Sequence, residues 1–166
     1  PSGSYKGSSR ESLVATAFYA RSTELVIKAG HVLGEDVSAY EKLYETIVAA
    51  FRKAFPEYLT QTELVLAAHF RLAEDLQHTA DLLAARVRAD GTKLQTGFVG
   101  TPYILHVLSD YGHADLAWEL LLRKEYPSWL YPITKGATTI WEHWDGIMQD
   151  GGFWSKDMNS FNHYAY

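Results

Sequence analysis

The sequence predicts an all-α fold built from successive antiparallel helix pairs. Apolar residues recur at i, i+3, i+4 and i+7 along most of the chain before Tyr126, which is the period of an amphipathic helix. Capping residues and glycines divide this pattern into segments of ordinary helix length, and no strong polar-apolar alternation predicts a strand. The pattern alone also fits a bundle or a solenoid. Two long aromatic loops, at 93–100 and 126–152, instead favour a functional domain.

The first helix is expected over about 10–29. Gly30 or Gly34 is its expected end, because glycine readily adopts the left-handed conformation that terminates a helix. The Gly/Ser-rich residues before it are expected to form a surface loop. Its apolar side is expected to consist of Val14, Phe18, Leu25 and Val32.

The second and third helices each begin with the spacing of a capping box. Ser38 lies three residues before Glu41, and Thr60 lies three residues before Glu63. In such a box the hydroxyl and the carboxylate each accept a hydrogen bond from a backbone amide that the helix leaves unpaired. These helices are expected over 38–55 and 60–71.

Three more helices are expected over 74–89, 101–111 and 114–124. The fifth begins at Thr101-Pro102, an N-cap followed by proline at the first helical position. The segment after the sixth, 126–135, is expected to be irregular because it holds two prolines. A seventh helix is expected to begin at Ser160.

Composition and charge exclude several function classes. The net charge of the 166-residue chain is −5 and no run of Lys and Arg exceeds two residues, which argues against nucleic acid or an anionic membrane as partner. No apolar stretch approaches the ~20 residues of a membrane span. The absence of cysteine excludes disulfides and thiol catalysis. It suits the cytoplasm without requiring it, so the compartment stays open.

Tryptophan is concentrated late in the chain, since all five indoles lie between Trp118 and Trp154. Aromatic walls with scattered acids suit sugar rings, whose C–H faces stack on indoles while their hydroxyls bind polar groups. The alternative is an ordinary aromatic core. The composition therefore points to a carbohydrate site without establishing one.

The stretch GATTIWEHWDG, at 136–146, places two carboxylates and two indoles within five residues. A packed core tolerates neither acid, so we expect a lined cavity in which Glu142, partly removed from water, acts as a general base. The alternative is a glutamate in a surface salt bridge. Asp145 lies too close for the second carboxyl of an inverting glycosidase, because i and i+3 residues of a helix are only ~5–6 Å apart at Cβ. We expect it to orient a neighbour or cap a turn.

A second polar-aromatic stretch, MNSFNHYAY, occupies 158–166. His163, with Asn159 and Asn162, supplies donors and acceptors of the kind that bind sugar hydroxyls, although a core histidine is the alternative. Glu142, His143 and His163 do not have the spacing of a known metal motif, so neither a metal nor a cofactor is expected. Further residues that could line a pocket are Thr96, Phe98, Thr101, Trp129 and Tyr131.

These stretches carry a family resemblance. The runs TQTELVLAAHF (60–70), TGFVGTPYILHVLSDYGHADLAWELLLRKEYPSWLYPITKGATTIWEHWDG (96–146) and MNSFNHYAY (158–166) resemble the C-terminal part of the catalytic domain of bacterial α-L-rhamnosidases, glycoside hydrolase family 78. The resemblance extends nearly from end to end, starting at SLVATAFYA (12–20). Residues 1–166 are therefore expected to form a single partial domain, the C-terminal portion of an (α/α)6 barrel.

The resemblance implies inverting hydrolysis of terminal α-L-rhamnose from plant glycosides or polysaccharides. It implies that Glu142 is the general base and that His163 contacts the bound rhamnose, with Trp141 and Trp144 near the pocket. The family's general acid has no counterpart in this chain. The alternatives are another (α/α)6 glycosidase with a different sugar preference, and a helical carbohydrate-binding module without catalysis.

The family barrel has twelve helices, whereas about seven are expected here. The chain alone is therefore expected to be feebly active at most, because inversion needs both carboxyl groups. A partial barrel also leaves apolar helix faces uncovered. The expected partner is the remainder of the barrel, in cis or as another chain.

Overall fold

The structure is a computed structural model that describes residues 9–157 and 160–163. Within these residues the chain forms seven helices and no strand, so the predicted all-α class is confirmed. None of the helices in this described part is long and apolar enough to cross a membrane. The helices are α1 (Glu11–Leu33), α2 (Ser38–Ala54), α3 (Gln61–His69), α4 (Leu76–Ala89), α5 (Thr101–Asp110), α6 (Ala114–Leu122) and α7 (Leu130–Thr134).

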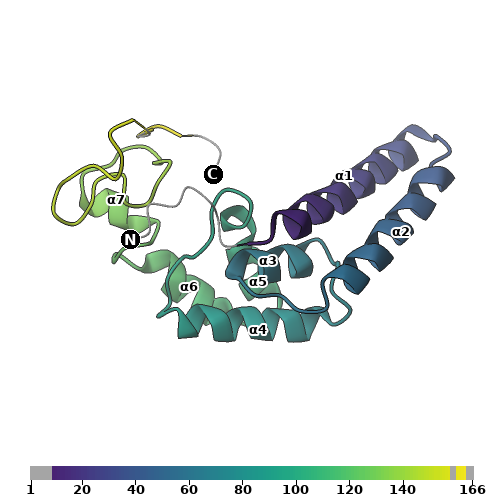
Figure 1. Ribbon diagram of the computed structural model, residues 1–166, viewed down its shortest axis with the longest axis horizontal. Coiled ribbons are helices and arrows are strands. Elements are labelled where there is room, and N and C mark those ends of the chain that lie inside the picture. Colours follow the sequence, from purple (N-terminus) through teal and green to yellow (C-terminus); the bar gives the residue numbers. More distant parts are fainter. Residues whose placement is uncertain (1–8, 158–159, 164–166) are drawn as a thin grey trace.

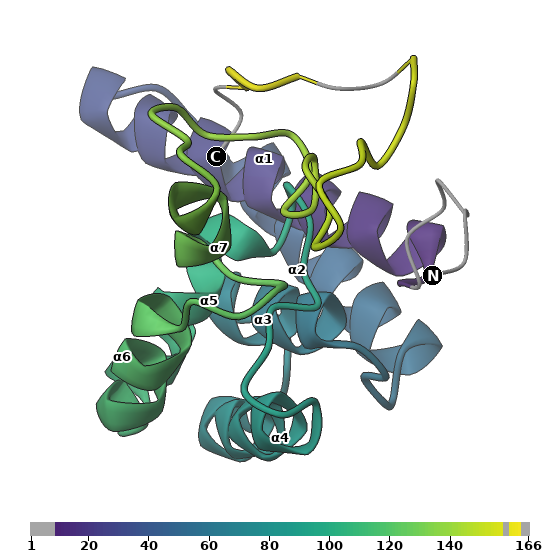
Figure 2. The ribbon, with the colours of Figure 1, turned by 90° about the vertical axis from the view of Figure 1, so that its left-hand side faces the viewer.

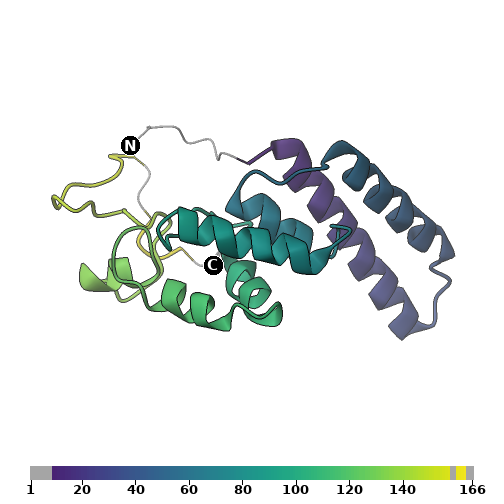
Figure 3. The ribbon, with the colours of Figure 1, turned by 90° about the horizontal axis from the view of Figure 1, so that it is seen from below.

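The first six helices form three successive antiparallel pairs, α1 with α2, α3 with α4, and α5 with α6 (Figure 1). Helix α3 also packs against α1 and α5, so one helix of each pair joins a continuous row. The irregular segment after α6 lies at one end of the molecule, and the loop between α1 and α2 lies at the other (Figures 1 and 3). This arrangement confirms the helix pairs that the sequence predicts.

Helix α3 lies between two apolar cores, and every residue from Gln61 to Ala68 is buried. Leu64 and Val65 belong to the core shared with α4, α5 and α6, whereas Leu66 and Ala67 belong to the core shared with α1 and α2. Residues 64–68 are small or apolar around the whole circumference, as burial on all sides requires, and the buried polar residues Gln61, Thr62 and Glu63 lie in the first turn. Along the molecule's long axis, α3 is seen in the middle of the helices (Figure 2).

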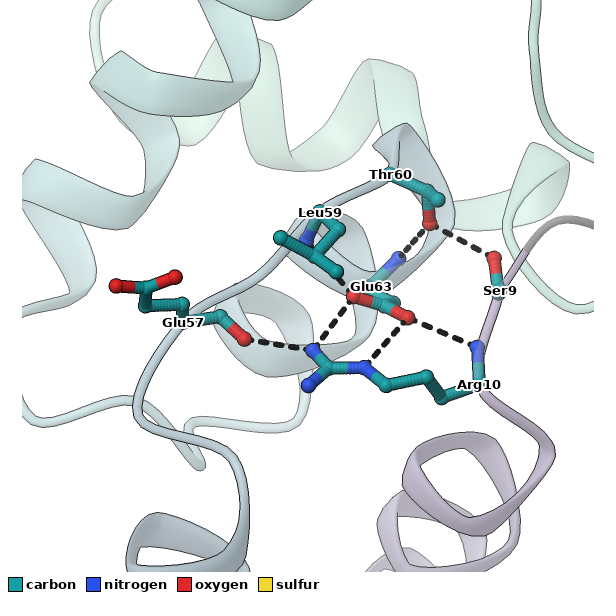
Figure 4. A network of polar contacts seen from close by, with 6 residues as sticks. All are labelled: Ser9, Arg10, Glu57, Leu59, Thr60 and Glu63. Atoms are coloured by element: carbon teal, nitrogen blue, oxygen red, sulfur yellow. Dashed lines mark hydrogen bonds and ion pairs between the residues drawn. The ribbon is translucent and has the colours of Figure 1, made fainter.

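The start of α3 is joined to the start of α1 by a polar network (Figure 4). Thr60 Oγ1 accepts a hydrogen bond from Glu63 N at 3.2 Å, so the hydroxyl half of this predicted capping box is confirmed, whereas the Glu63 carboxylate accepts from Leu59 N in place of Thr60 N. The Glu63 carboxylate, which is fully buried, accepts bonds from the backbone amide of Arg10 at 2.9 Å, from its guanidinium at 2.8 and 3.1 Å, and from Leu59 N at 2.8 Å. The Glu63 carboxylate thus joins the start of α3 to the residue before α1 and to the loop between α2 and α3.

The other predicted capping box is wrong. Helix α2 has Val37 as its N-cap residue and no side-chain cap, and Ser38 is already helical. The carboxylate of Asp36 accepts the bond from Ser38 N at 3.0 Å. An acid two residues upstream therefore replaces the hydroxyl that the sequence pattern suggested.

Helix α1 continues to Leu33 and ends at Gly34, which has a φ of 73°. Its buried residues are Leu13, Ala17, Ala20, Thr23 and Gly30. Leu25 and Val32, which we expected on the apolar side, are 49% and 87% exposed. Small side chains make the buried face of this helix, and the larger apolar residues of its last turns remain uncovered.

Two predictions about irregular segments are also wrong. A short helix, α7, forms within 126–135, because Pro132 lies in its first turn, where the missing N–H is not needed. The described residues 160–163 are not helical. Three of their backbone groups, Ser160 O, Phe161 O and His163 N, bond instead to residues 139–142. The remainder of the predicted seventh helix lies outside the described residues.

Candidate functional site

The site is built around the irregular segment that follows α7. Gly136, with a φ of 87°, lets the chain leave the helix at a position where a β-carbon would be strained. Its amide donates to Ile133 O at 3.0 Å, and the next amide, of Ala137, donates to Pro132 O at 3.0 Å. These bonds close the helix end and direct the chain into the turn that carries Glu142.

Residues 139–142 and 160–163 lie side by side, although some twenty residues separate them in sequence. Glu142 N donates to Ser160 O at 2.9 Å, and His163 N donates to Ile140 O at 2.8 Å. Thr139 Oγ1 adds a bond to Phe161 O. The structure therefore brings together the two stretches that the sequence singled out, and places the backbones of Glu142 and His163 on adjoining segments.

The two tryptophans beside Glu142 pack in different directions. Trp141 is 4% exposed, and its ring meets Phe161 edge to face at 5.1 Å. Trp144 meets Trp129 edge to face at 6.0 Å and packs against the core of α3 to α6. Glu142 lies between these anchors and is half-buried. Each indole thus fixes one side of the turn.

The loop before α5 reaches the site through Phe98. Its ring stacks on His163 at 4.7 Å with an interplanar angle of 11°, and Phe98 remains 40% exposed. Thr96 and Thr101 are buried and share a hydrogen bond of 2.8 Å between their hydroxyls. Phe98 thus contacts the predicted site residue His163, while the two threonines bond to each other within the loop and at the start of α5.

Sequence reasoning did not find the contact between His143 and Trp154. Their rings stack at 3.9 Å, and the chain between them folds back through a bridge between Ile147 and Phe153. The Asp150-Gly151 dipeptide is a signal that could have found this turn, since it is a common two-residue connection between paired segments. Gly151 has a φ of 85°.

Asp145 lies beside Tyr126, which also escaped the sequence analysis. Burial and the negative charge of the nearby Asp145 carboxylate raise the pKa of Tyr126 to about 12. The neighbouring Tyr131 is buried and donates from its hydroxyl to Ile147 O at 2.9 Å.

Several hollows lie on the described surface. One of about 270 Å³ borders the site and is lined by Lys135, Gly136, Ala137, Thr138, Thr139, Trp141, Ile147, Phe153 and Phe161. Another, of about 400 Å³, lies between the start of α1 and residues Gln95, Gly97 and Val99. A larger one, of about 660 Å³, lies between α2 and α4, away from the site. The linings of these three include neither Glu142 nor His163.

No group of three His, Asp or Glu side chains within 9–157 and 160–163 is arranged to hold a metal ion. Asn162 is exposed, and Asn159 lies outside the described residues. The chemistry available on the described turn is therefore that of a carboxylate, imidazoles and indoles. Such groups can bind sugar hydroxyls and activate a water molecule.

Comparison with known proteins identifies relatives of the whole chain. Residues 2–166 match the family described as the bacterial α-L-rhamnosidase 6 hairpin glycosidase domain. The crystal structure of Streptomyces avermitilis α-L-rhamnosidase complexed with L-rhamnose is 44% identical with a TM-score of 0.89, over 93% of this chain and 16% of that one. The native enzyme from Aspergillus terreus is 33% identical with a TM-score of 0.89, over 96% and 20%. An α-L-rhamnosidase of Formosa agariphila is 41% identical, over 99% and 19%. The chain thus spans at most a fifth of these relatives' length.

Proposed function

The chain belongs to the bacterial α-L-rhamnosidase six-hairpin glycosidase family, and we propose that it supplies the general-base side of an α-L-rhamnosidase active site. In this proposal Glu142 takes a proton from the water that attacks the anomeric carbon of a terminal α-L-rhamnose. His163 contacts the bound sugar, and Trp141 and Trp144 lie at the pocket wall.

One observation carries the proposal: the pairing of 139–142 with 160–163. The bonds from Glu142 N to Ser160 O and from His163 N to Ile140 O hold a carboxylate-bearing and an imidazole-bearing segment against each other. A base works only when its carboxylate is held within hydrogen-bonding reach of the water, so a turn anchored on both sides suits this role. The half-buried position of Glu142 supports it too.

The proposed reaction inverts the anomeric centre in one displacement. The bond from the water oxygen to the anomeric carbon forms as the glycosidic bond breaks, and Glu142 accepts the water proton. The departing oxygen takes a proton from an acid that lies outside this chain, about 6.5–9.5 Å from the base. The first product is then β-L-rhamnose.

The chain acts, in this proposal, as a single partial domain, the C-terminal portion of an (α/α)6 barrel. The exposed apolar residues of α1 support an incomplete barrel, since Leu25 and Val26 are 49% and 45% exposed and Val32 and Leu33 are 87% and 75% exposed. Such a surface favours burial against further chain. The proposed partner is the remainder of the barrel, in cis or as another chain.

The test is hydrolysis of an aryl α-L-rhamnoside by the full-length polypeptide that contains this chain. Glu142→Gln removes the base but keeps the side-chain volume, so we expect the rate to fall by ~10²–10⁴ while the sugar still binds. Glu119→Gln, on the exposed surface of α6, is the matched control and should leave the rate unchanged. Proton NMR of the first product reports the anomer.

Each other outcome has a definite meaning. If Glu142→Gln hydrolyses the aryl rhamnoside at the unmodified rate, the general base is another residue. Early formation of the α anomer rules out inversion. Rhamnose binding that is unaffected by Glu142→Gln, with no turnover by the unmodified protein, identifies a carbohydrate-binding module instead of an enzyme.

A further inference from the structure

The loop before α5 holds an aromatic ring against the proposed sugar contact. The rings of Phe98 and His163 stack with 4.7 Å between their centroids and an interplanar angle of 11°. The backbone of His163 is fixed by the bond from its amide to Ile140 O. That bond does not set the rotation of the side chain about its own bonds, for which several rotamers exist. The stacked phenyl ring therefore supplies a restraint that the backbone lacks, because it fixes the plane of the imidazole.

The plane of the imidazole matters for binding a sugar. Both ring nitrogens lie in this plane, so its orientation decides in which directions the ring donates and accepts hydrogen bonds. Such bonds weaken steeply when the angle at the hydrogen falls below about 120°, so a ring that rotates loses its bond to a fixed hydroxyl. A phenyl ring restrains the imidazole through its face and has no polar atom that would occupy a nitrogen. The stack thus orients the histidine without competing for its hydrogen bonds.

The loop that carries Phe98 is anchored at its start by Gln61, in the first turn of α3. This side chain is 1% exposed. Its Oε1 accepts a hydrogen bond from Gln95 N at 3.0 Å, and its Nε2 donates to Lys93 O at 2.9 Å and to Asp90 Oδ2 at 2.8 Å. One buried amide group therefore fixes the chain from the end of α4 to Gln95.

The end of the loop is fixed as well. Gly97 O accepts bonds from Gly100 N and Thr101 N, both at 3.0 Å, and these bonds close the turn that contains Phe98. A β-carbon at Gly100 would lie 3.0 Å from Thr62 Oγ1, so the turn passes close against α3. The backbone on either side of Phe98 is thus held by contacts that do not involve its ring, and the ring projects from a rigid support.

We propose that Phe98 is a positioning residue for sugar binding: its ring holds the imidazole of His163 in the plane from which a ring nitrogen meets a rhamnose hydroxyl. The ring of Phe98 is not part of either apolar core and is 40% exposed, so its removal should cost the fold little. Its effect on binding should pass through His163. This inference rests on the proposed contact of His163 with the sugar.

Titration of the full-length polypeptide with L-rhamnose gives the first test. Phe98→Leu keeps an apolar side chain but removes the flat ring, so we expect the Kd for L-rhamnose to rise by ~3-fold to 10-fold. Phe98→Tyr keeps the ring face and should bind L-rhamnose like the unmodified protein. Tyr40→Ala, which removes a similarly exposed aromatic side chain of α2 (47%), is the matched control and should leave the Kd unchanged.

A double variant distinguishes positioning from a general structural role. His163→Ala removes the proposed contact and should raise the Kd by itself. If Phe98 acts through the imidazole, the variant that combines Phe98→Leu with His163→Ala should bind no more weakly than His163→Ala alone. If Phe98 instead shapes the pocket by holding its loop, the two losses should add.

Amide hydrogen exchange tests the loop without any sugar. The amides of Gly100 and Thr101 report the turn, because both donate to Gly97 O, and Phe98→Leu should leave their exchange unchanged. Faster exchange, additive losses in the double variant or an unchanged Kd in Phe98→Leu would each overturn the inference. An unchanged Kd in His163→Ala would reject the proposed role of His163, and the inference would fall with it. An unchanged Kd in Phe98→Leu beside a raised Kd in His163→Ala would overturn the inference alone.

Discussion

The molecule consists of two regions that are held together in different ways. Residues 9–122 form helices that pack on two cores of buried aliphatic and phenylalanine side chains. Residues 123–163, as far as described, form one short helix and irregular chain held by individual hydrogen bonds and ring contacts. All predicted catalytic and sugar-binding residues lie in the second region. Apolar packing thus supplies the scaffold, and directional contacts shape the site.

This difference predicts that stability and activity respond to different substitutions. In the helical region, burial of apolar area sets the free energy of unfolding, so the most buried side chains should matter most. In the irregular region, a lost contact should loosen the turn locally and leave the helices folded.

The largest loss of unfolding free energy is expected when a buried phenylalanine is truncated, and truncation of an exposed phenylalanine is the matched control. Phe51 is fully buried and packs against Phe55 at 5.1 Å between ring centroids, whereas Phe153 is 60% exposed. Phe51→Ala should lower the free energy of unfolding by about 3–5 kcal/mol, the usual cost of truncating a core aromatic residue. Phe153→Ala should change it by less than ~0.5 kcal/mol. Denaturant unfolding followed by circular dichroism measures the free energy of unfolding of both variants. Equal losses in the two variants would contradict the proposed difference between the two regions.

A smaller effect is expected from the polar network of Arg10 and Glu63 in the helical region. Glu63→Gln removes the charge that binds Arg10 and Leu59 N, which should cost about 1–3 kcal/mol. This expected cost is below that of breaking a fully buried ion pair, because the Arg10 side chain is 34% exposed and water screens its charge. Glu24→Gln, which breaks ion pairs with Arg21 and Lys28 along the surface of α1, should cost ~0–1 kcal/mol.

The same network predicts sensitivity to acid. Burial alone would raise the pKa of Glu63, but hydrogen bonds from Arg10 and Leu59 N outweigh burial and hold the pKa below its ordinary value of 4.5. The stability from this carboxylate is therefore complete above 4.5 and is lost as the pH falls through the lower pKa of the folded state. Unfolding free energies measured from about pH 7 to about pH 3 should fall less steeply in Glu63→Gln than in the unmodified protein. Parallel pH profiles would contradict this.

The helical region could be predicted from the sequence largely because its determinants are local. The 3.6-residue period and the Thr60 cap depend on residues within one turn of each other, and both are confirmed. Asp36 shows the limit of such rules. Its carboxylate accepts the hydrogen bond from Ser38 N, whereas the sequence pattern assigned the capping role to the Ser38 hydroxyl. The burial pattern of α1 was predicted less well, because it depends on how closely neighbouring helices approach Ala17 and Ala20.

The irregular region could be predicted only in part. Its residue types indicated Glu142 and His163 as candidates. No periodicity in a sequence predicts which backbone groups form hydrogen bonds across twenty residues. The bond from Glu142 N to Ser160 O and the stack of Phe98 on His163 exist because helices bring distant segments together. Tyr126 carried no motif at all. The charge that acts on it comes from Asp145, nineteen residues later, and this proximity is visible only in three dimensions.

The smallest predicted effect tests whether helix starts obey local rules where the structure says they do. Thr60→Ala removes an N-cap that accepts from Glu63 N, and should lower the free energy of unfolding by ~1 kcal/mol. Ser38→Ala has the same sequence setting but no side-chain cap, because Asp36 accepts from Ser38 N, so the change should be within ~0.5 kcal/mol. Thermal unfolding of the two variants beside the unmodified chain measures the difference. If Ser38→Ala proved as destabilising as Thr60→Ala, the Ser38 hydroxyl would cap α2 as the sequence pattern suggests, and the bond from Ser38 N to Asp36 would not replace it.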